Sequence, residues 1–235
     1  MRGAAMIAWL DPDSLDFPEA DRAPGDAPLA AGGDLAAERL LRAYAAGIFP
    51  WYNEPPILWW SPDPRMALSP LDLRVNRSLA KALRRHDYAI RFDTAFSRVI
   101  RACAAPRARQ PGTWINAAMV AAYEDLFARG HAHSAEVWYG EALIGGLYGV
   151  ALGGAFFGES MFSAADYASK IAFVGLVARL KAAGFALIDC QVPSDHMASL
   201  GATLMPRRVF LTRLRDAIGL PIEAGRWQST AEVGP

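Results

Sequence analysis

The chain has 235 residues, 53% of them hydrophobic, which is enough to build a sizeable core in one large domain or in two smaller ones. No apolar run approaches the ~20 residues of a membrane-spanning helix, and the apolar N-terminal stretch is too short for a signal peptide. Only Cys103 and Cys190 are cysteines, a number that excludes a disulfide framework and favours a reducing cytoplasm.

The formal net charge is zero, but the charges are unevenly distributed along the chain. Residues 1–64 carry 4 basic and 10 acidic side chains, a balance of −6, whereas residues 65–109 carry 11 and 3, a balance of +8. A strongly basic segment can attract phosphates locally even when the whole chain is neutral.

The first third of the chain predicts an irregular, proline-rich stretch with one short helix. Asp34 or a neighbour can cap this helix, which runs through Tyr44 and stops at Gly47. Five prolines accompany the aromatic residues of the following segment 48–64, and they argue against a helix or a central strand there. Its tryptophans are expected to pack in a small core under loops.

A basic stripe follows on a predicted helix over residues 76–86, for which Asn76 is the expected cap. The spacing i, i+4, i+7 and i+8 places four basic side chains on one face of the helix: Arg77, Lys81, Arg84 and Arg85. Such a stripe is usually a solvated face, yet it lacks the interspersed glutamates of a salt-bridged surface helix. The pattern leaves both interpretations open, a solvated face and a phosphate-binding face.

The second half predicts helices near residues 94–103 and 116–129, and then a three-stranded antiparallel meander. Its strands are expected at 133–138, 143–150 and 155–162, and are followed by a helix over 165–183, a strand over 185–190, a short helix capped by Ser194 and a last helix over 208–218. This order predicts an α+β fold with an acyltransferase-like core. We expect an N-terminal domain over 1–64, a basic helical segment over 65–110 that belongs with it, and the acyltransferase domain over 111–235.

Glu159 lies inside a strongly apolar predicted strand. Strand alternation puts Phe157, Glu159 and Met161 on one face. An ionised carboxylate in such surroundings needs a partner, because burying it alone is costly. The partner is either a structural cation such as Lys170 or the ammonium group of a ligand in an apolar pocket.

Asp189 and Gln191 end the next predicted strand, two residues apart. The carboxylate can orient the amide, and the amide oxygen can accept a hydrogen bond from an amine. The alternative is that the pair caps the turn at Pro193. The spacing of Cys190 and His196 is too weak a signal for a cysteine nucleophile, no zinc-ligand spacing is present, and neither a metal nor a cofactor is expected.

The segment 163–169 before the long helix contains no glycine, so it lacks the backbone-amide cradle that would hold a pyrophosphate. This absence argues against acetyl-CoA as the acyl donor. A second glycine cluster, 145–149, lies inside a predicted strand and is expected to serve close packing of the sheet.

Eight blocks of the sequence occur together in one order: AGGDL at 31–35, GIFPW at 47–51, WWSPDPR at 59–65, GTWI at 112–115, HAHS at 131–134, GESMFS at 158–163, IDCQ at 188–191 and SLGA at 199–202. In these blocks the chain resembles the bacterial leucyl/phenylalanyl-tRNA–protein transferases, over roughly residues 9–212. The resemblance implies a small N-terminal domain joined to a domain of the N-acetyltransferase type with a mixed, largely antiparallel sheet, which uses aminoacyl-tRNA in place of acetyl-CoA.

The resemblance also implies roles for individual residues. Glu159 resembles the carboxylate that holds the aminoacyl α-ammonium group, and Trp114 and Trp51 resemble aromatic residues at the terminal adenosine. The walls of the pocket for the Leu or Phe side chain would be Phe156, Met161, Ile188, Leu147 and Phe173. The acceptor stem of the tRNA would be bound by four basic residues: Arg77, Lys81, Arg84 and Arg85. The catalytic residues would be Asp189 and Gln191.

The implied reaction is attack of an acceptor α-amine on the aminoacyl ester. Asp189 would orient Gln191, and the proton would pass to Gln191 or to a ribose hydroxyl of the tRNA. We expect transfer of Leu or Phe, with Met as a further candidate, to proteins that begin with Arg or Lys, which marks them for degradation. The expected enzyme is a cytoplasmic monomer that does not bind membranes. Two alternatives are a conventional N-acetyltransferase that uses acetyl-CoA and a non-enzymatic RNA-binding module.

Overall fold

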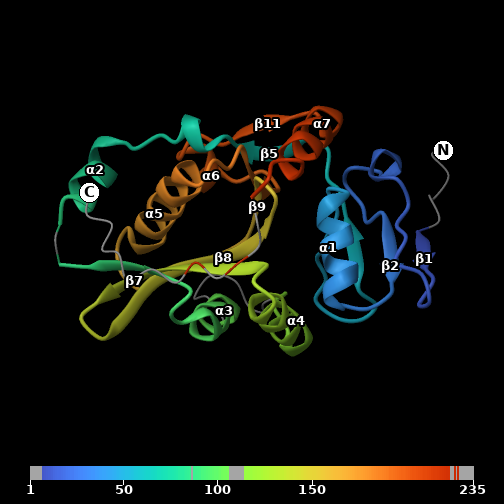
Figure 1. Cartoon of the computed structure of the whole chain (residues 1–235), viewed down its shortest axis with the longest axis horizontal. Helices are drawn as coiled ribbons and strands as arrows, with labels where there is room; N and C mark the ends of the chain where they lie inside the picture. Colours follow the sequence, from blue (N-terminus) through green and yellow to red (C-terminus); the bar gives the residue numbers. More distant parts are fainter. Residues whose placement is uncertain (1–6, 86, 106–113, 223–224, 226, 228–235) are drawn as a thin grey trace.

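The computed structural model describes residues 7–85, 87–105, 114–222, 225 and 227 of the chain. The strands in this part form two sheets (Figure 1). The smaller sheet has the strand order β1-β2-β4-β3. Its strands are β1 (Ala8–Leu10), β2 (Ala30–Gly32), β3 (Phe49–Pro50) and β4 (Leu58–Trp60), and the helix α1 (Ala37–Ala45) connects β2 to β3.

One expectation for the strands of this N-terminal unit was wrong. β4 is a central strand, because its three residues contain no proline and the single strand proline, Pro50, lies in the edge strand β3. Asp34 does not cap α1, whose N-cap is Ala36. Its carboxylate instead accepts a hydrogen bond from the backbone N–H of Ala36 and pairs with the buried Arg39. Trp59 is fully buried, but it lies in a large core that also contains residues of the larger sheet and its helices, and not in a separate small core.

The larger sheet is mixed and has seven strands in the order β11-β5-β10-β9-β8-β7-β6. In chain order these are β5 (Arg65–Leu68), β6 (Ala89–Phe92), β7 (Ala132–Tyr139), β8 (Ala142–Leu152), β9 (Ala155–Ser163), β10 (Leu187–Gln191) and β11 (Thr203–Met205). The predicted meander is confirmed as β7-β8-β9, and β10 is parallel to β9, while the other pairs in this sheet are antiparallel. The α+β class with a largely antiparallel mixed sheet is thereby confirmed.

The basic segment 65–110 supplies the strands β5 and β6 to this larger sheet. The sequence grouped this segment with the N-terminal region, whereas its two strands pair with strands of the C-terminal part of the chain. The physical reason is that these strands form hydrogen bonds with strands far away in the sequence: β5 pairs with β10 and β11, and β6 pairs with β7. No local sequence pattern in the segment predicts which strands these two pair with.

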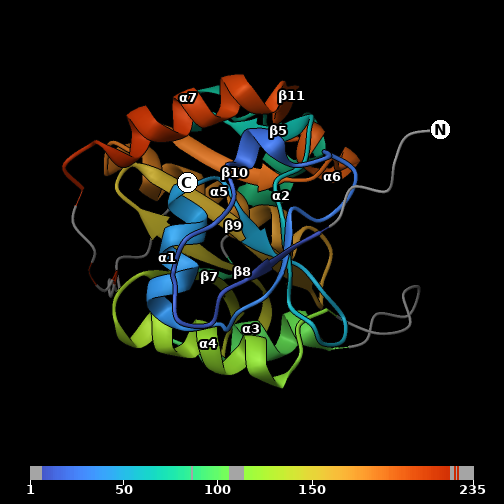
Figure 2. The ribbon, with the colours of Figure 1, turned by 90° about the vertical axis from the view of Figure 1, so that its right-hand side faces the viewer.

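Helices cover both faces of the larger sheet (Figures 1 and 2). The helices α3 (Phe96–Ala104) and α4 (Ala117–Ala128) lie on one face, and α5 (Ala168–Ala182) lies on the other. The helix α1 packs against α4 and against α7 (Arg207–Ile218), which places the N-terminal unit beside one end of this sheet. The remaining helices are α2 (Arg77–Leu83), α6 (Asp195–Ala198), and the 3₁₀ turns Ala20–Arg22 and Pro70–Asp72.

Candidate functional site

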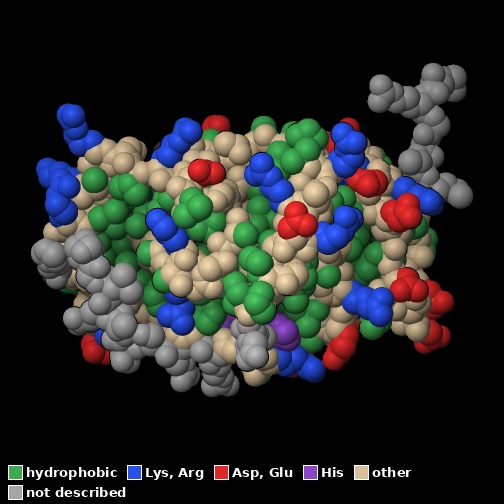
Figure 3. Space-filling view, turned by 45° about the horizontal axis from the view of Figure 1, so that its top comes forward, with side chains coloured by type: hydrophobic (Ala, Val, Ile, Leu, Met, Phe, Trp, Pro, Cys, Tyr) green, Lys and Arg blue, Asp and Glu red, His purple; other side chains and the backbone are tan. Residues whose placement is uncertain are grey.

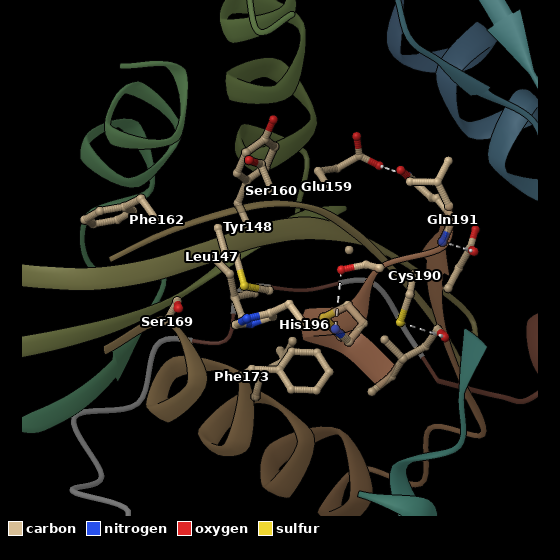
Figure 4. A pocket seen from close by; sticks show the side chains of 18 of the residues that line it. Leu147, Tyr148, Glu159, Ser160, Phe162, Ser169, Phe173, Cys190, Gln191 and His196 are labelled. Carbon is tan, nitrogen blue, oxygen red and sulfur yellow. Dashed lines mark hydrogen bonds between the residues drawn. The ribbon is translucent and has the colours of Figure 1, made fainter. Parts of the chain in front are cut away.

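The strands β9 and β10 pair only at their beginnings, up to the Phe157–Asp189 pair. Beyond this point a cavity of about 940 Å³ opens (Figure 4). It is lined by residues of β8, β9, α5, β10, α6 and the end of α3. All five residues expected to form an apolar pocket are among them: Leu147, Phe156, Met161, Phe173 and Ile188.

A bulge in β9 directs the side chains around this cavity. Tyr148 pairs with Ser160 and Gly149 pairs with Gly158, so Glu159 is the extra, unpaired residue that forms the bulge in β9. The simple alternation over residues 157–161 was therefore wrong. Phe157 packs on Tyr44 with ring centroids 4.8 Å apart, outside the cavity, whereas Met161 lines the cavity together with Phe156.

Gly149 permits this arrangement of β8 and β9. A Cβ atom at this position would collide with the carbonyl oxygen of Phe157 and with the ring of Phe156. A side chain here would force the two strands apart at the bulge. The expectation that the glycines of β8 serve close packing is confirmed.

Glu159 is buried and accepts hydrogen bonds from three neutral donors. The hydroxyl of Tyr44 donates to Oε1 (2.8 Å), the hydroxyl of Tyr123 donates to Oε2 (2.9 Å), and Nε2 of Gln191 donates to Oε1 (2.9 Å). The hydroxyl oxygens of Tyr44 and Tyr123 also lie in close contact, but because each hydroxyl has one proton and donates it to Glu159, this contact adds no further donor when the carboxylate is ionised. Lys170, the cation considered as a partner, instead lies 3.4 Å from Oγ of Ser199.

Burial raises the pKa of Glu159 to about 7, against the opposing effect of the three donors. No ion pair of Glu159 with a basic side chain occurs within the described residues. A carboxylate can accept about four hydrogen bonds, so one position remains for a further donor. The site can therefore bind an ammonium group next to an apolar side chain.

Replacing Tyr123 by phenylalanine is expected to raise the pKa of Glu159 further above its ordinary value, because the lost hydroxyl donor stabilises only the ionised carboxylate. A ¹³C NMR titration of the glutamate carboxyl carbons would measure this shift. Tyr148→Phe is the matched control, because within the described residues the Tyr148 hydroxyl has no hydrogen-bond partner. If the pKa of Glu159 were the same in the two variants, this result would contradict the assignment of Tyr123 as a donor that stabilises the ionised carboxylate.

Asp189 is completely buried in an ion pair with Arg65. Nε and Nη2 of Arg65 donate to its two carboxylate oxygens at 2.9 and 2.6 Å, and Nη1 donates to the carbonyl of Gly47 at 3.0 Å. The guanidinium also lies over the rings of Phe49 and Phe210, at 4.8 and 4.5 Å from their centroids. A carboxylate held by two guanidinium N–H groups in this way is a poor candidate for a proton acceptor.

Asp189 fixes Gln191 through the backbone. Its Oδ1 accepts the backbone N–H of Gln191 at 2.9 Å, and Gln191 has a left-handed backbone with φ of 63°. Asp189 therefore contacts the backbone of Gln191, while the side-chain amide contacts Glu159. Because the NH₂ group of Gln191 donates to Glu159, its amide oxygen is left to accept a hydrogen bond from a bound amine.

The two tryptophans expected at an adenosine are not among the residues that line the cavity. Trp51 is 40% exposed and its ring packs on Trp60 with centroids 5.4 Å apart. Trp114 is half-buried and packs against the core on the α3–α4 side of the larger sheet.

The basic stripe is exposed, but it is shorter than predicted. Asn76 caps α2 as expected by accepting the N–H of Leu79, and the helix ends at Leu83, so Arg85 lies beyond it and pairs with Asp87. Figure 3 shows Lys and Arg side chains gathered at the end of the molecule where α2 lies. In the part of the chain that the structure describes, the Arg85–Asp87 pair is the one ion pair formed by the basic side chains of this stripe.

Cysteine and metal chemistry receive no support from the geometry. Burial raises the pKa of the Cys190 thiol, which stays protonated and contacts the carbonyl of Ile188. Burial also lowers the pKa of His196 at the cavity wall. Within the described ranges no three His, Cys, Asp or Glu side chains are grouped so that they could hold a metal ion.

Sequence reasoning did not find three residues of this site. Tyr44 and Tyr123 stand in ordinary helical patterns and approach Glu159 only through packing of α1 and α4. Arg65 stands in the WWSPDPR block, and its basic side chain in an apolar strand was an available signal of a buried ion pair.

No helix in the part of the chain that the structure describes combines the length and apolarity needed to cross a bilayer. The family model described as leucyl/phenylalanyl-tRNA protein transferase matches residues 67–215, and the model for the N-terminal domain of that family matches residues 33–63. A solved structure titled as a GCN5-related N-acetyltransferase from Kribbella flavida covers 70% of this chain and 58% of its own, at 11% identity and a TM-score of 0.34. A score this low does not establish a shared fold.

Two relatives are similar over nearly their whole length. The leucyl/phenylalanyl-tRNA–protein transferase of Ectopseudomonas mendocina is 55% identical over 223 residues, which cover 93% of this chain and 98% of the relative. The protein of the same name from Nitrosospira multiformis is 53% identical over 225 residues, covering 94% and 97%. The chain therefore belongs to the leucyl/phenylalanyl-tRNA–protein transferase family.

Proposed function

We propose that this chain transfers Leu or Phe, with Met as a further donor residue, from aminoacyl-tRNA to the α-amino group of proteins that begin with Arg or Lys. The observation that carries the proposal is the buried carboxylate of Glu159, which lines an apolar cavity and forms no ion pair within the described residues. An aminoacyl ester of Leu or Phe has an ammonium group one carbon away from an apolar side chain, and this arrangement of groups matches the site. The names of the relatives supply the donor, aminoacyl-tRNA.

The position of each residue in the structure determines the role that we propose for it. The ammonium group would bind Glu159, and the apolar side chain would enter the cavity between β8, β9, β10 and α5. Its walls are Leu147, Phe156, Met161, Phe173 and Ile188. Trp51 and Trp114 are proposed to contact the terminal adenosine, and the exposed face of α2 with Arg77, Lys81, Arg84 and Arg85 is proposed to contact the acceptor stem.

The reaction needs no covalent enzyme intermediate, because the aminoacyl ester is already activated. The acceptor amine attacks the ester carbonyl, a C–N bond forms, and the C–O bond to the ribose breaks. The amide oxygen of Gln191 holds the attacking amine by a hydrogen bond, and Asp189 with Arg65 holds Gln191 in place. Since the ion pair of Asp189 makes it a poor base, the proton passes to the departing ribose hydroxyl.

The test is transfer of labelled leucine from Leu-tRNA to a peptide that begins with Arg. The same peptide with an acetylated N-terminus is the control, and Val-tRNA tests the donor pocket. We expect transfer to the free Arg peptide only, with Leu favoured over Val by about 10- to 200-fold, since one methylene decides ~1–3 kcal/mol in an apolar pocket. Folded protein that transfers nothing would overturn the proposal.

The cytoplasm is the proposed compartment, since charged tRNA is found there, and a monomer is the proposed state. Acetyl-CoA transfer is the alternative. The turn before α5 has no glycine, and Tyr167 takes the left-handed conformation at the helix N-cap, so an aromatic side chain stands where a pyrophosphate would need bare backbone. Binding of CoA at micromolar concentration would favour that alternative.

A further inference from the structure

We propose that Arg91 and Arg98, held on the ring of Trp138, form a second phosphate-binding surface that contacts the backbone of the aminoacyl-tRNA beyond the part bound by α2. The inference rests on the proposed role of α2 in tRNA binding.

The two guanidinium groups are held by one indole ring. Arg91 lies on β6, Arg98 on α3 and Trp138 on β7, and the guanidinium carbons lie 4.9 and 4.8 Å from the ring centroid. Trp138 is buried, and its Nε1 donates to Oε2 of Glu136 at 3.1 Å, which fixes the orientation of the ring. A fixed ring restricts two long side chains and lowers the entropy that they lose when they bind a ligand.

Both arginines lack a carboxylate partner. Neither forms an ion pair within the described residues, whereas other surface arginines do, as in Arg22–Glu19, Arg42–Asp16, Arg85–Asp87, Arg101–Glu124 and Arg129–Asp125. Two like charges on one ring repel each other, so an arrangement without a counter-ion favours an anionic ligand.

Glu136, the carboxylate opposite Arg91 in the strand pairing, is already occupied. Its oxygens accept the backbone N–H groups of Thr94 and Ala95 at 2.9 and 2.8 Å and the hydroxyl of Ser134 at 2.9 Å. The hydroxyl of Thr94 and Nε1 of Trp138 complete the set. With five donors present, Glu136 has no free lone pair for a guanidinium, and the N–H groups of Arg91 and Arg98 remain available.

This surface lies at the same end of the molecule as α2 but on the other face of the larger sheet, because α2 packs against α5 whereas Arg98 belongs to α3. The chain passes from Arg84 and Arg85 into β6, and β6 pairs with the end of β7 that carries Trp138. β6 begins at Ala89, shortly after Arg85, and Ala89 pairs with Trp138, which places the two regions close together. In Figure 1 the helix α2 and the strand β7 lie at the same end of the molecule.

The ligand chemistry is that of a repeated, singly charged oxyanion. A guanidinium binds two phosphate oxygens with parallel hydrogen bonds, and a row of such groups matches a polynucleotide backbone. An acidic peptide would offer carboxylates at irregular spacing and would not need to reach α2 as well. The favoured partner is therefore a second stretch of the tRNA phosphate backbone.

The experiment measures the affinity for Leu-tRNA as a function of salt between about 50 and 200 mM. Each phosphate contact contributes a slope of about 0.7–0.9 to the plot of log Kd against log salt, so R91Q/R98Q is expected to lower the slope by about 1.4–1.8. Arg215→Gln is the matched control, because Arg215 is an exposed arginine of α7 without an ion pair in the described chain, and it should keep the wild-type slope. A variant of α2, R77Q/K81Q/R84Q, is measured in parallel.

The arms separate this inference from the role of α2. A wild-type slope in R91Q/R98Q together with a lower slope in the α2 variant would overturn the second surface and keep the first. Wild-type slopes in both would overturn both. Because Arg91 and Arg98 pack on Trp138, R98Q and R98E are also measured and their thermal unfolding is checked. Arg98 is exposed, so both should fold, and the charge reversal should weaken binding more than R98Q does.

Discussion

Replacing Arg65 by leucine is expected to lower the free energy of unfolding by about 3–5 kcal/mol and to abolish aminoacyl transfer. The substitution leaves the carboxylate of Asp189 completely buried without its cation. It also removes a donor from the carbonyl of Gly47, although that oxygen still accepts a hydrogen bond from Ser61 at 3.1 Å. Urea unfolding measures the loss of stability, and the Leu-tRNA assay measures transfer.

The double variant Arg65→Leu/Asp189→Leu separates folding from function. Apolar side chains in place of both partners avoid an unpaired buried charge, so most of the lost stability should return. Transfer should stay low, because the backbone N–H of Gln191 no longer has its acceptor and the left-handed conformation at Gln191 loses its support. Recovery of transfer in the double variant would show that the ion pair only stabilises the fold.

Replacing Glu159 by glutamine is expected to lower kcat/KM for Leu-tRNA by about 10- to 100-fold, since a hydrogen bond to a charged group is worth ~1.5–3 kcal/mol. Glutamine keeps the size of the side chain but cannot balance an ammonium group. The fully buried Asp189 cannot substitute, because Arg65 neutralises it. Transfer kinetics with Leu-tRNA and Phe-tRNA measure the effect.

The pH dependence provides the control for this variant. The pKa of Glu159 is raised to about 7, so the carboxylate is mostly protonated at pH 6 and mostly ionised at pH 8. Only the ionised form attracts an ammonium group, and kcat/KM should therefore rise with pH through about 7 and then level off. In the E159Q variant this step should disappear. A step that persists unchanged would belong to another group and would remove Glu159 from the role of ammonium ligand.

The two predictions concern residues that differ in how clearly the sequence alone points to them. Glu159 is conspicuous in the sequence, because a carboxylate inside an apolar strand has few explanations. The sequence does not show the bulge that reorients Glu159. The alternation of β9 shifts because β9 packs closely against Gly149 of the neighbouring strand β8. The resemblance implied the walls of an apolar pocket, and the bulge explains why Phe156 and Met161 line the same cavity.

The sequence by itself determined the elements that depend on near neighbours. The meander, the helix α5, the Asn76 cap and the exposed basic face of α2 all follow from periodicity and capping within a few residues. The tertiary structure alone decided the partners of the two buried carboxylates, Asp189 and Glu159. Arg65 lies 124 residues from Asp189, and Tyr44 lies 115 residues from Glu159. Such contacts depend on which strands and helices pack together, and hydrogen-bond donors of equal local character occur throughout the chain.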